Sequence, residues 1–125
     1  MNGVTFDAGG LIALEGNDRR VLSLVAMALE QGDEIVIPAT ALAQVIRNPA
    51  RQVRLWRLIQ RSRTEVVPLD YGYAQAVGAL LSRTGTADIA DAHVVLSAQK
   101  AGHAVITSDP NDLRRLDPKL RIIAV

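Results

Sequence analysis

Apolar positions along the chain fall into two kinds of segment. Short continuous apolar, largely β-branched runs predict strands, whereas longer stretches with apolar residues at helical spacing predict helices. The predicted strands are residues 3–6, 34–37, 64–67, 103–107 and 121–125. The predicted helices are residues 11–14, 21–30, 41–47, 49–62, 71–82, 89–101 and 110–116.

Turn and capping residues set the boundaries of these elements. Pro38 ends the second strand, Thr40 is placed to cap the helix after it, and Pro49 is placed to open the next one. Strands that alternate with helices predict a parallel sheet with helices on both faces. Ligands of such sheets bind beyond the carboxyl ends of the strands. We therefore expect one α/β domain over residues 1–125.

Composition supports a folded domain and narrows its class. The 125 residues are 49% hydrophobic, which argues against disorder, and no apolar stretch approaches the roughly 20 residues of a membrane span. The first ten residues lack the basic and apolar regions of a signal peptide. Without cysteine there is no disulfide framework and no thiolate metal site. We therefore expect a cytoplasmic protein with no membrane association.

The net charge of +1 indicates nothing about partners, but the distribution of basic residues along the chain does. Arginine is concentrated between residues 47 and 63, and Arg54, Arg57 and Arg61 fall on one side of a predicted amphipathic helix. This basic face is either a solvated surface or a set of phosphate contacts. Aromatic residues make up only 3% of the chain, which argues against a base-stacking platform for single strands.

Four aspartates are the candidate metal-binding or catalytic residues. Asp7 directly follows the first predicted strand, and Asp109 follows the fourth with one residue between. Asp88 and Asp91 open the helix over residues 89–101 and share one helix face. If the two strands are neighbours, all four carboxylates meet in one pocket, which is unfavourable unless a cation neutralises them. Oxygen-only ligands favour Mg²⁺ or Mn²⁺.

Each of these acids also has an ordinary structural explanation. Asp7 could cap the helix after it, and Asp88 and Asp91 suit the positive end of a helix dipole. Asp109 and Asp112 flank a proline in a pattern typical of a helix start. The residues alone leave capping and metal binding both open.

Three segments resemble the signature blocks of PIN-domain ribonucleases, and more narrowly of VapC toxins from bacterial toxin–antitoxin pairs. They are "TFDAGGLIALEG", "IPATALAQVIR" and "DAHVVLSAQKAGHAVITSDPNDL", and the resemblance covers essentially the whole chain. It implies a three-layer α/β/α fold around a central, mainly parallel sheet of about five strands. It also implies a Mg²⁺-dependent endoribonuclease, with Mn²⁺ as a possible substitute, in which a metal-activated water cleaves RNA. The implied partners are RNA, a cognate antitoxin and a second copy of the chain.

Carried over by position, the resemblance assigns Asp7, Asp91 and Asp109 as catalytic and metal-binding acids. Asp88 lies one turn before Asp91, and we expect it to supply a further negative charge near the metal. Asp112 is expected in a supporting position, as part of a helix start rather than as a direct ligand.

The chain departs from the family pattern at two places. Gln44 stands in "ALAQV" where the family normally has a glutamate, and Gly9 stands where a small hydroxyl or amide residue is usual. Gln44 is expected to support the site without a charge. The basic face, Arg54, Arg57 and Arg61, is expected to contact RNA or the antitoxin. The alternative is a catalytically degenerate PIN-like module that binds RNA or protein.

Other catalytic classes have weaker support. A phosphatase with an aspartyl nucleophile usually has a DxD motif after its first strand, and this chain has Asp7-Ala8-Gly9. His93 is expected to face away from Asp91 as a structural residue, and His103 is expected to belong to a turn.

Overall fold

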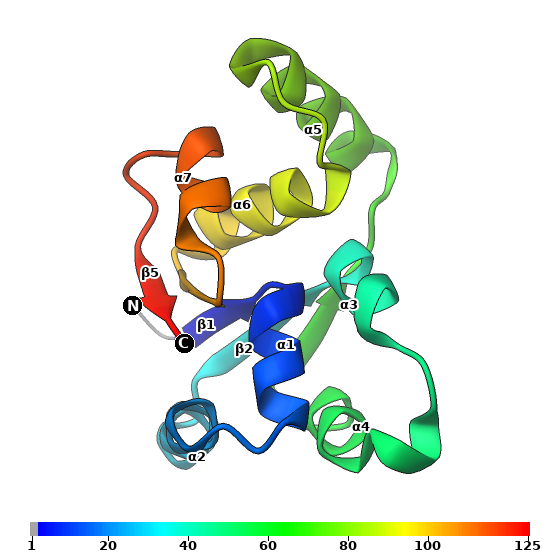
Figure 1. Cartoon of the computed structure of the whole chain (residues 1–125), viewed down its shortest axis with the longest axis vertical. Helices are drawn as coiled ribbons and strands as arrows, with labels where there is room; N and C mark the ends of the chain where they lie inside the picture. The colour runs from blue at the N-terminus through cyan, green and yellow to red at the C-terminus, as the bar shows by residue number, and fades with distance from the viewer. Residues whose placement is uncertain (1–2) are drawn as a thin grey trace.

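The computed structural model describes residues 3–125 and contains a five-stranded sheet between two layers of helices (Figure 1). The strands are β1 (Gly3–Phe6), β2 (Glu34–Pro38), β3 (Thr64–Val67), β4 (Ala104–Thr107) and β5 (Ile122–Ala124). The helices are α1 (Ala8–Glu15), α2 (Arg19–Gln31), α3 (Ala39–Val45), η1 (Pro49–Arg51, a 3₁₀ turn), α4 (Val53–Ile59), α5 (Tyr71–Thr84), α6 (Ile89–Ala101) and α7 (Pro110–Leu116). The expected three-layer α/β/α architecture is confirmed.

All strand pairs are parallel, and the order across the sheet is β3-β2-β1-β4-β5. The chain therefore proceeds from β1 to β2 on one side and later returns to β4 on the other side of β1. This reversal is a topological switch point, where the loops after two adjacent strands diverge and leave a crevice. The sequence-based expectation that β1 and β4 are neighbours is confirmed, with Phe6 opposite Ile106.

Each face of the sheet has its own hydrophobic core. Alternate residues of a strand point to opposite faces, so Ile106 packs with Phe6 and Leu11 under α1, α2 and α4. Val105 points the other way and packs with Val95 under α5, α6 and α7. Figure 1 shows these two helical layers on either side of the sheet. The two cores fix the ends of β1 and β4 relative to the start of α6.

Several predicted bounds shift by up to three residues, and two assignments around α3 and α4 are wrong. Thr40 does not cap α3, because the helix begins at Ala39 after Pro38 and the Thr40 hydroxyl instead pairs with His93 Nδ1 at 2.8 Å. The single helix expected over residues 49–62 is split into η1 and α4 at Gln52. The buried Gln52 side chain makes hydrogen bonds to the backbone of Val45 and Arg47, and these contacts hold the chain in a turn there.

No helix within residues 3–125 is long and apolar enough to cross a membrane.

Candidate active site

Asp7 lies at the switch point, where β1 passes directly into α1. It is 6% exposed and caps α1, since its Oδ1 accepts a hydrogen bond of 2.8 Å from the backbone N–H of Gly10. Its Oδ2 accepts a second hydrogen bond from the hydroxyl of Thr107, the last residue of β4. Burial nevertheless raises the pKa of Asp7 above its ordinary value. Asp7 is therefore both a helix cap and a carboxylate oriented from the neighbouring strand.

Asp88 and Asp91 reach the same crevice from the start of α6. Asp88 is the N-cap residue, and its Oδ1 accepts a 2.9 Å hydrogen bond from the backbone N–H of Asp91. Asp91 is half-buried, and burial together with the charges of Asp88, Asp112, Asp7 and Asp109 raises its pKa to about 6. The fold thus brings these carboxylates, which are far apart in sequence, within electrostatic reach of one another.

Asp109 and Asp112 complete the group at the start of α7. The backbone N–H of Asp109 donates to the Thr107 hydroxyl at 2.9 Å, and Asp109 occupies the N-cap position without capping the helix through its side chain. A hydrogen bond from the Asp112 side chain raises the pKa of Asp109, against a smaller lowering effect of Arg115. Capping thus explains Asp7 and Asp88, and Asp91 lies in the first turn of α6, where its charge also suits the helix dipole.

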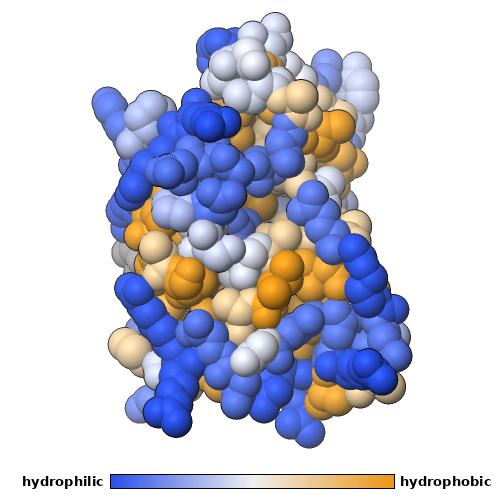
Figure 2. Space-filling model, in the orientation of Figure 1, coloured by the Kyte–Doolittle hydropathy of each residue, from blue (hydrophilic) through white to orange (hydrophobic). Residues whose placement is uncertain are grey.

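A cavity of about 310 Å³ opens beside three of these acids, Asp88, Asp91 and Asp112. It lies between the turn before α6 and the exposed side of α7, over which hydrophilic side chains gather in Figure 2. The lining residues are Gly85, Thr86, Ala87, Asp88, Asp91, Asp112, Arg115 and Leu116. Asp112 and Arg115 thereby join Asp88 and Asp91 in one cavity, and we call it the acidic cavity.

The two departures from the family pattern have different structural outcomes. Gln44 is exposed on α3 and lines a separate cavity of about 470 Å³ with Glu15, Arg47 and other residues, none of which is an aspartate. At Gly9, a Cβ atom would lie 2.1 Å from the Ser108 hydroxyl oxygen. The space that a side chain at position 9 would need is therefore already filled by a hydroxyl from the loop after β4.

The basic face lies apart from the acidic cavity. Arg54, Arg57 and Arg61 border a small cavity of about 150 Å³ between α2 and α4, together with apolar side chains that include Leu14 and Leu22. Apolar side chains are also exposed over α1 on the face shown in Figure 2. Ile12 of α1 is 57% exposed. The arginines are thus placed beside an apolar groove.

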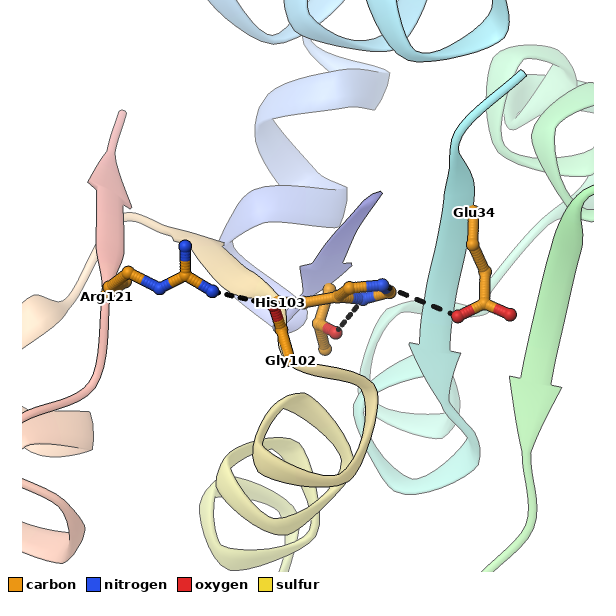
Figure 3. A network of polar contacts seen from close by, with 5 residues as sticks. Glu34, Gly102, His103 and Arg121 are labelled. Atoms are coloured by element: carbon orange, nitrogen blue, oxygen red, sulfur yellow. Dashed lines mark hydrogen bonds and ion pairs between the residues drawn. The ribbon is translucent and has the colours of Figure 1, made fainter. Parts of the chain in front are cut away.

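Neither histidine belongs to the acidic cavity. His93 is fully buried, as expected for a structural residue. His103 closes the turn after α6, as expected, since its backbone N–H donates to the Ala98 carbonyl oxygen at 3.0 Å. Its side chain makes further contacts that were not expected: Nδ1 lies 3.0 Å from the Thr5 hydroxyl and Nε2 lies 3.4 Å from Glu34 (Figure 3). His103 thereby links β1, β2 and β4 at their amino ends, opposite the carboxyl ends that carry the acids. Burial lowers the pKa of both histidines.

The acids suit a hard divalent cation by their chemistry. Within residues 3–125 no three acidic or histidine side chains lie close enough together, as they stand, to hold a metal ion. Mg²⁺ does not require such a group, since it typically keeps several waters and binds one or two carboxylates together with phosphate oxygens. Burial and the charges of the neighbouring carboxylates raise the pKa of Asp91, and a cation among them would favour its ionised form. The oxygen donors of these residues therefore suit Mg²⁺ by their chemistry.

Sequence reasoning missed three side chains of this region: Thr107, Ser108 and Arg115. Thr107 could be predicted only with the register of β1 and β4, because a register that pairs Phe6 with Ile106 puts Thr107 opposite Asp7. Arg115 was visible from its spacing, since it follows Asp112 by three residues on one helix and such residues share a face. Nothing in the linear sequence indicated that Ser108 fills the space beside Gly9.

Comparisons with known proteins agree with this architecture. A family profile described as the PIN domain matches residues 4–119. The crystal structure of VapBC2 from Rickettsia felis, bound to a promoter DNA fragment, aligns with a TM-score of 0.72 at 16% identity over 98% of both chains. FitAB bound to the IR36 DNA fragment aligns with a TM-score of 0.64 at 18% identity, over 97% of this chain and 94% of that one. FitAcB from Neisseria gonorrhoeae aligns with a TM-score of 0.62 at 16% identity, over 96% of each chain. No curated protein sequence matches.

Proposed function

The chain belongs to the PIN domain family, and we propose that it is a Mg²⁺-dependent endoribonuclease, the toxin of a VapBC-like toxin–antitoxin pair. The observation that carries this proposal is that the charges of Asp7 and Asp109, which follow the adjacent strands β1 and β4, act on the half-buried Asp91 carboxylate at the start of α6. The fold shared with VapBC2 and FitAB supports it. A cytoplasmic location, a homodimeric state and an RNA substrate belong to the same proposal.

Asp7, Asp91 and Asp109 would hold the ion, with Asp88 adding negative charge and Asp112 supporting Asp109. When bound, Mg²⁺ supplies a water nucleophile at neutral pH and a Lewis acid for the phosphate oxygens, and Mn²⁺ can replace it.

The protein's own residues orient the carboxylates of the site. Asp7 is fixed by hydrogen bonds from Gly10 and Thr107, so one carboxylate is preorganised before any ligand arrives. Thr107 also accepts from the backbone N–H of Asp109, which ties the first and last acids to the same hydroxyl. Asp91, whose pKa is about 6, is mostly ionised at neutral pH and ready to bind a cation. RNA approaches a site whose own charge repels phosphate, so cleavage requires a bound cation.

The test is expression of the parent chain and of Asp7→Asn in bacteria, followed by measurement of growth and RNA integrity. We expect arrest and RNA cleavage with the parent alone. In vitro, the purified parent should cut RNA with Mg²⁺ and not with EDTA, and Asp33→Asn, at the opposite end of β2, should behave as the parent. Cleavage that persists unchanged in Asp7→Asn would reject the proposal.

The groove bordered by Arg54, Arg57 and Arg61 is the proposed antitoxin site. Apolar side chains with a basic rim suit an amphipathic segment that carries acidic residues. Substituting Glu for Arg57 should weaken capture of the co-expressed antitoxin and leave RNA cleavage by the free toxin unchanged.

The second candidate is a degenerate PIN-like module that binds RNA or protein without cleavage. The position of Gln44, exposed in a cavity without aspartates, favours it. Mg²⁺ titration discriminates the two, because a degenerate site binds Mg²⁺ weakly and cuts nothing. Gln44→Glu should strengthen cleavage only if the side chain at this position reaches the metal.

A further inference from the structure

Arg115 is the one basic side chain that lines the acidic cavity in the part of the chain that the structure describes. It lies in the last turn of α7, three residues after Asp112, so both residues occupy the same helix face. The neighbouring Arg114 is rotated away from that face and does not line the cavity.

Arg115 lies among acidic side chains without forming an ion pair with any carboxylate of residues 3–125. Asp88, Asp91 and Asp112 line the same cavity, yet the Arg115 guanidinium lies within 4.0 Å of no carboxylate among residues 3–125. A guanidinium remains charged at any physiological pH and carries a planar set of N–H donors. These donors are therefore free to bind an acceptor that enters the cavity.

We propose that Arg115 binds the RNA phosphate at the acidic cavity and acts as a catalytic residue by direct contact with the substrate. This inference rests on the proposed nuclease function. An RNA phosphodiester carries one negative charge and two non-bridging oxygens, which match the guanidinium fork in a bidentate contact. Additional negative charge develops on those oxygens as water attacks, so the contact strengthens in the transition state.

A structural role makes a different prediction. If Arg115 only offsets the charge of Asp109 and Asp112, its removal should disorder the acids and weaken both Mg²⁺ binding and thermal stability. If Arg115 binds substrate, its removal takes a positive charge from the cavity, so Mg²⁺ should bind as tightly as before or more tightly. Only the structural role therefore predicts a loss of Mg²⁺ affinity.

The experiment compares the parent with Arg115→Gln, Arg115→Lys and the matched control Arg114→Gln. Three quantities are measured: cleavage of a fluorogenic RNA oligonucleotide in Mg²⁺, binding of a phosphorothioate RNA oligonucleotide by fluorescence anisotropy, and Mg²⁺ affinity from thermal unfolding. We expect Arg115→Gln to lose about 10²–10³-fold in cleavage rate. RNA binding should weaken about 5- to 10-fold. Arg115→Lys should fall between, since it keeps the charge and loses the fork, and Arg114→Gln should stay near the parent.

The possible results test the role of Arg115 separately from the nuclease function. If the parent cleaves RNA and Arg115→Gln does so as fast as Arg114→Gln, the role of Arg115 is rejected and the nuclease function stands. The role is also rejected if Arg115→Gln loses Mg²⁺ affinity together with activity. If the parent binds RNA without cutting it, the nuclease function fails, and weaker RNA binding by Arg115→Gln alone still supports a phosphate contact. A parent that neither binds nor cuts RNA overturns both.

Discussion

Replacing Asp91 by Asn should stabilise the protein when no metal is present. The Asp91 carboxylate is held half-buried among Asp7, Asp88, Asp109 and Asp112, and these surroundings raise its pKa from 3.8 to about 6. An acid whose pKa rises on folding contributes stability that is complete below the unfolded pKa and is lost as the pH rises through the folded pKa. Above about pH 6 the ionised side chain therefore works against folding, and a neutral amide of the same shape removes that penalty.

The size of the effect follows from the shift. The difference between 3.8 and about 6 is about 2.2 units, which corresponds to about 3 kcal/mol at 1.36 kcal/mol per unit. Asp91 is partly exposed, and screening by solvent reduces this to about 1–2 kcal/mol. The lost interaction of a negative charge with the first turn of α6 subtracts about 0.3–1 kcal/mol. A net gain of about 1 kcal/mol remains, or about 3–5 °C in Tm for a chain of this size.

The assay is thermal unfolding followed by circular dichroism in EDTA, at about pH 7.5 and again near pH 4. Asp91→Asn should melt higher than the parent at the first pH and equally at the second, and Glu30→Gln, an exposed position on α2, should match the parent throughout. Adding Mg²⁺ should raise the Tm of the parent more than that of Asp91→Asn. The reasoning is refuted if Asp91→Asn melts below the parent in EDTA at about pH 7.5, or if its advantage persists near pH 4.

Three further predictions concern the surroundings of the site. Gly9→Ser should cost about 1–3 kcal/mol because its Cβ meets the Ser108 hydroxyl, and the double variant with Ser108→Gly should regain most of it in urea unfolding. Thr107→Val should cost about 1–3 kcal/mol, since it removes the donor to Asp7 and the acceptor for Asp109; an unchanged urea midpoint would contradict this. The contribution of His103 runs opposite to that of Asp91: burial lowers the pKa of His103, so its contribution is present above 6.5 and lost as the pH falls through the folded pKa, and the Tm of the parent relative to that of His103→Gln should therefore fall on acidification below pH 6.5.

Element boundaries could be predicted wherever one local signal acted alone. The continuous apolar runs at Gly3–Phe6 and Thr64–Val67 are strands with the expected bounds, and Ile89–Ala101 and Pro110–Leu116 are helices with the expected bounds. The prediction failed where a side chain formed a distant contact instead. Thr40 pairs with His93 on α6, and Gln52 turns back onto the backbone of α3, so neither acts as its local sequence suggests.

The sequence by itself determined the order of the elements and the type of each, because apolar periodicity and turn residues act over a few neighbouring positions. It also placed Asp7 and Asp109 after strands, and the parallel sheet implied by the alternation turned those positions toward one edge. The likeness of three segments to PIN domains was readable at the same level.

Only the tertiary structure decided which side chains share a cavity. The strand order puts β4 beside β1, so Thr107 reaches Asp7 across one hydrogen-bonded step of the sheet, 100 residues away in the chain. The same packing puts Arg115 among the acids, while Arg57, in the most basic segment, lies beside an apolar groove. These contacts depend on how the two hydrophobic cores position the helices on opposite faces of the sheet. Contacts between residues so far apart in sequence produce no periodic pattern from which they could be predicted.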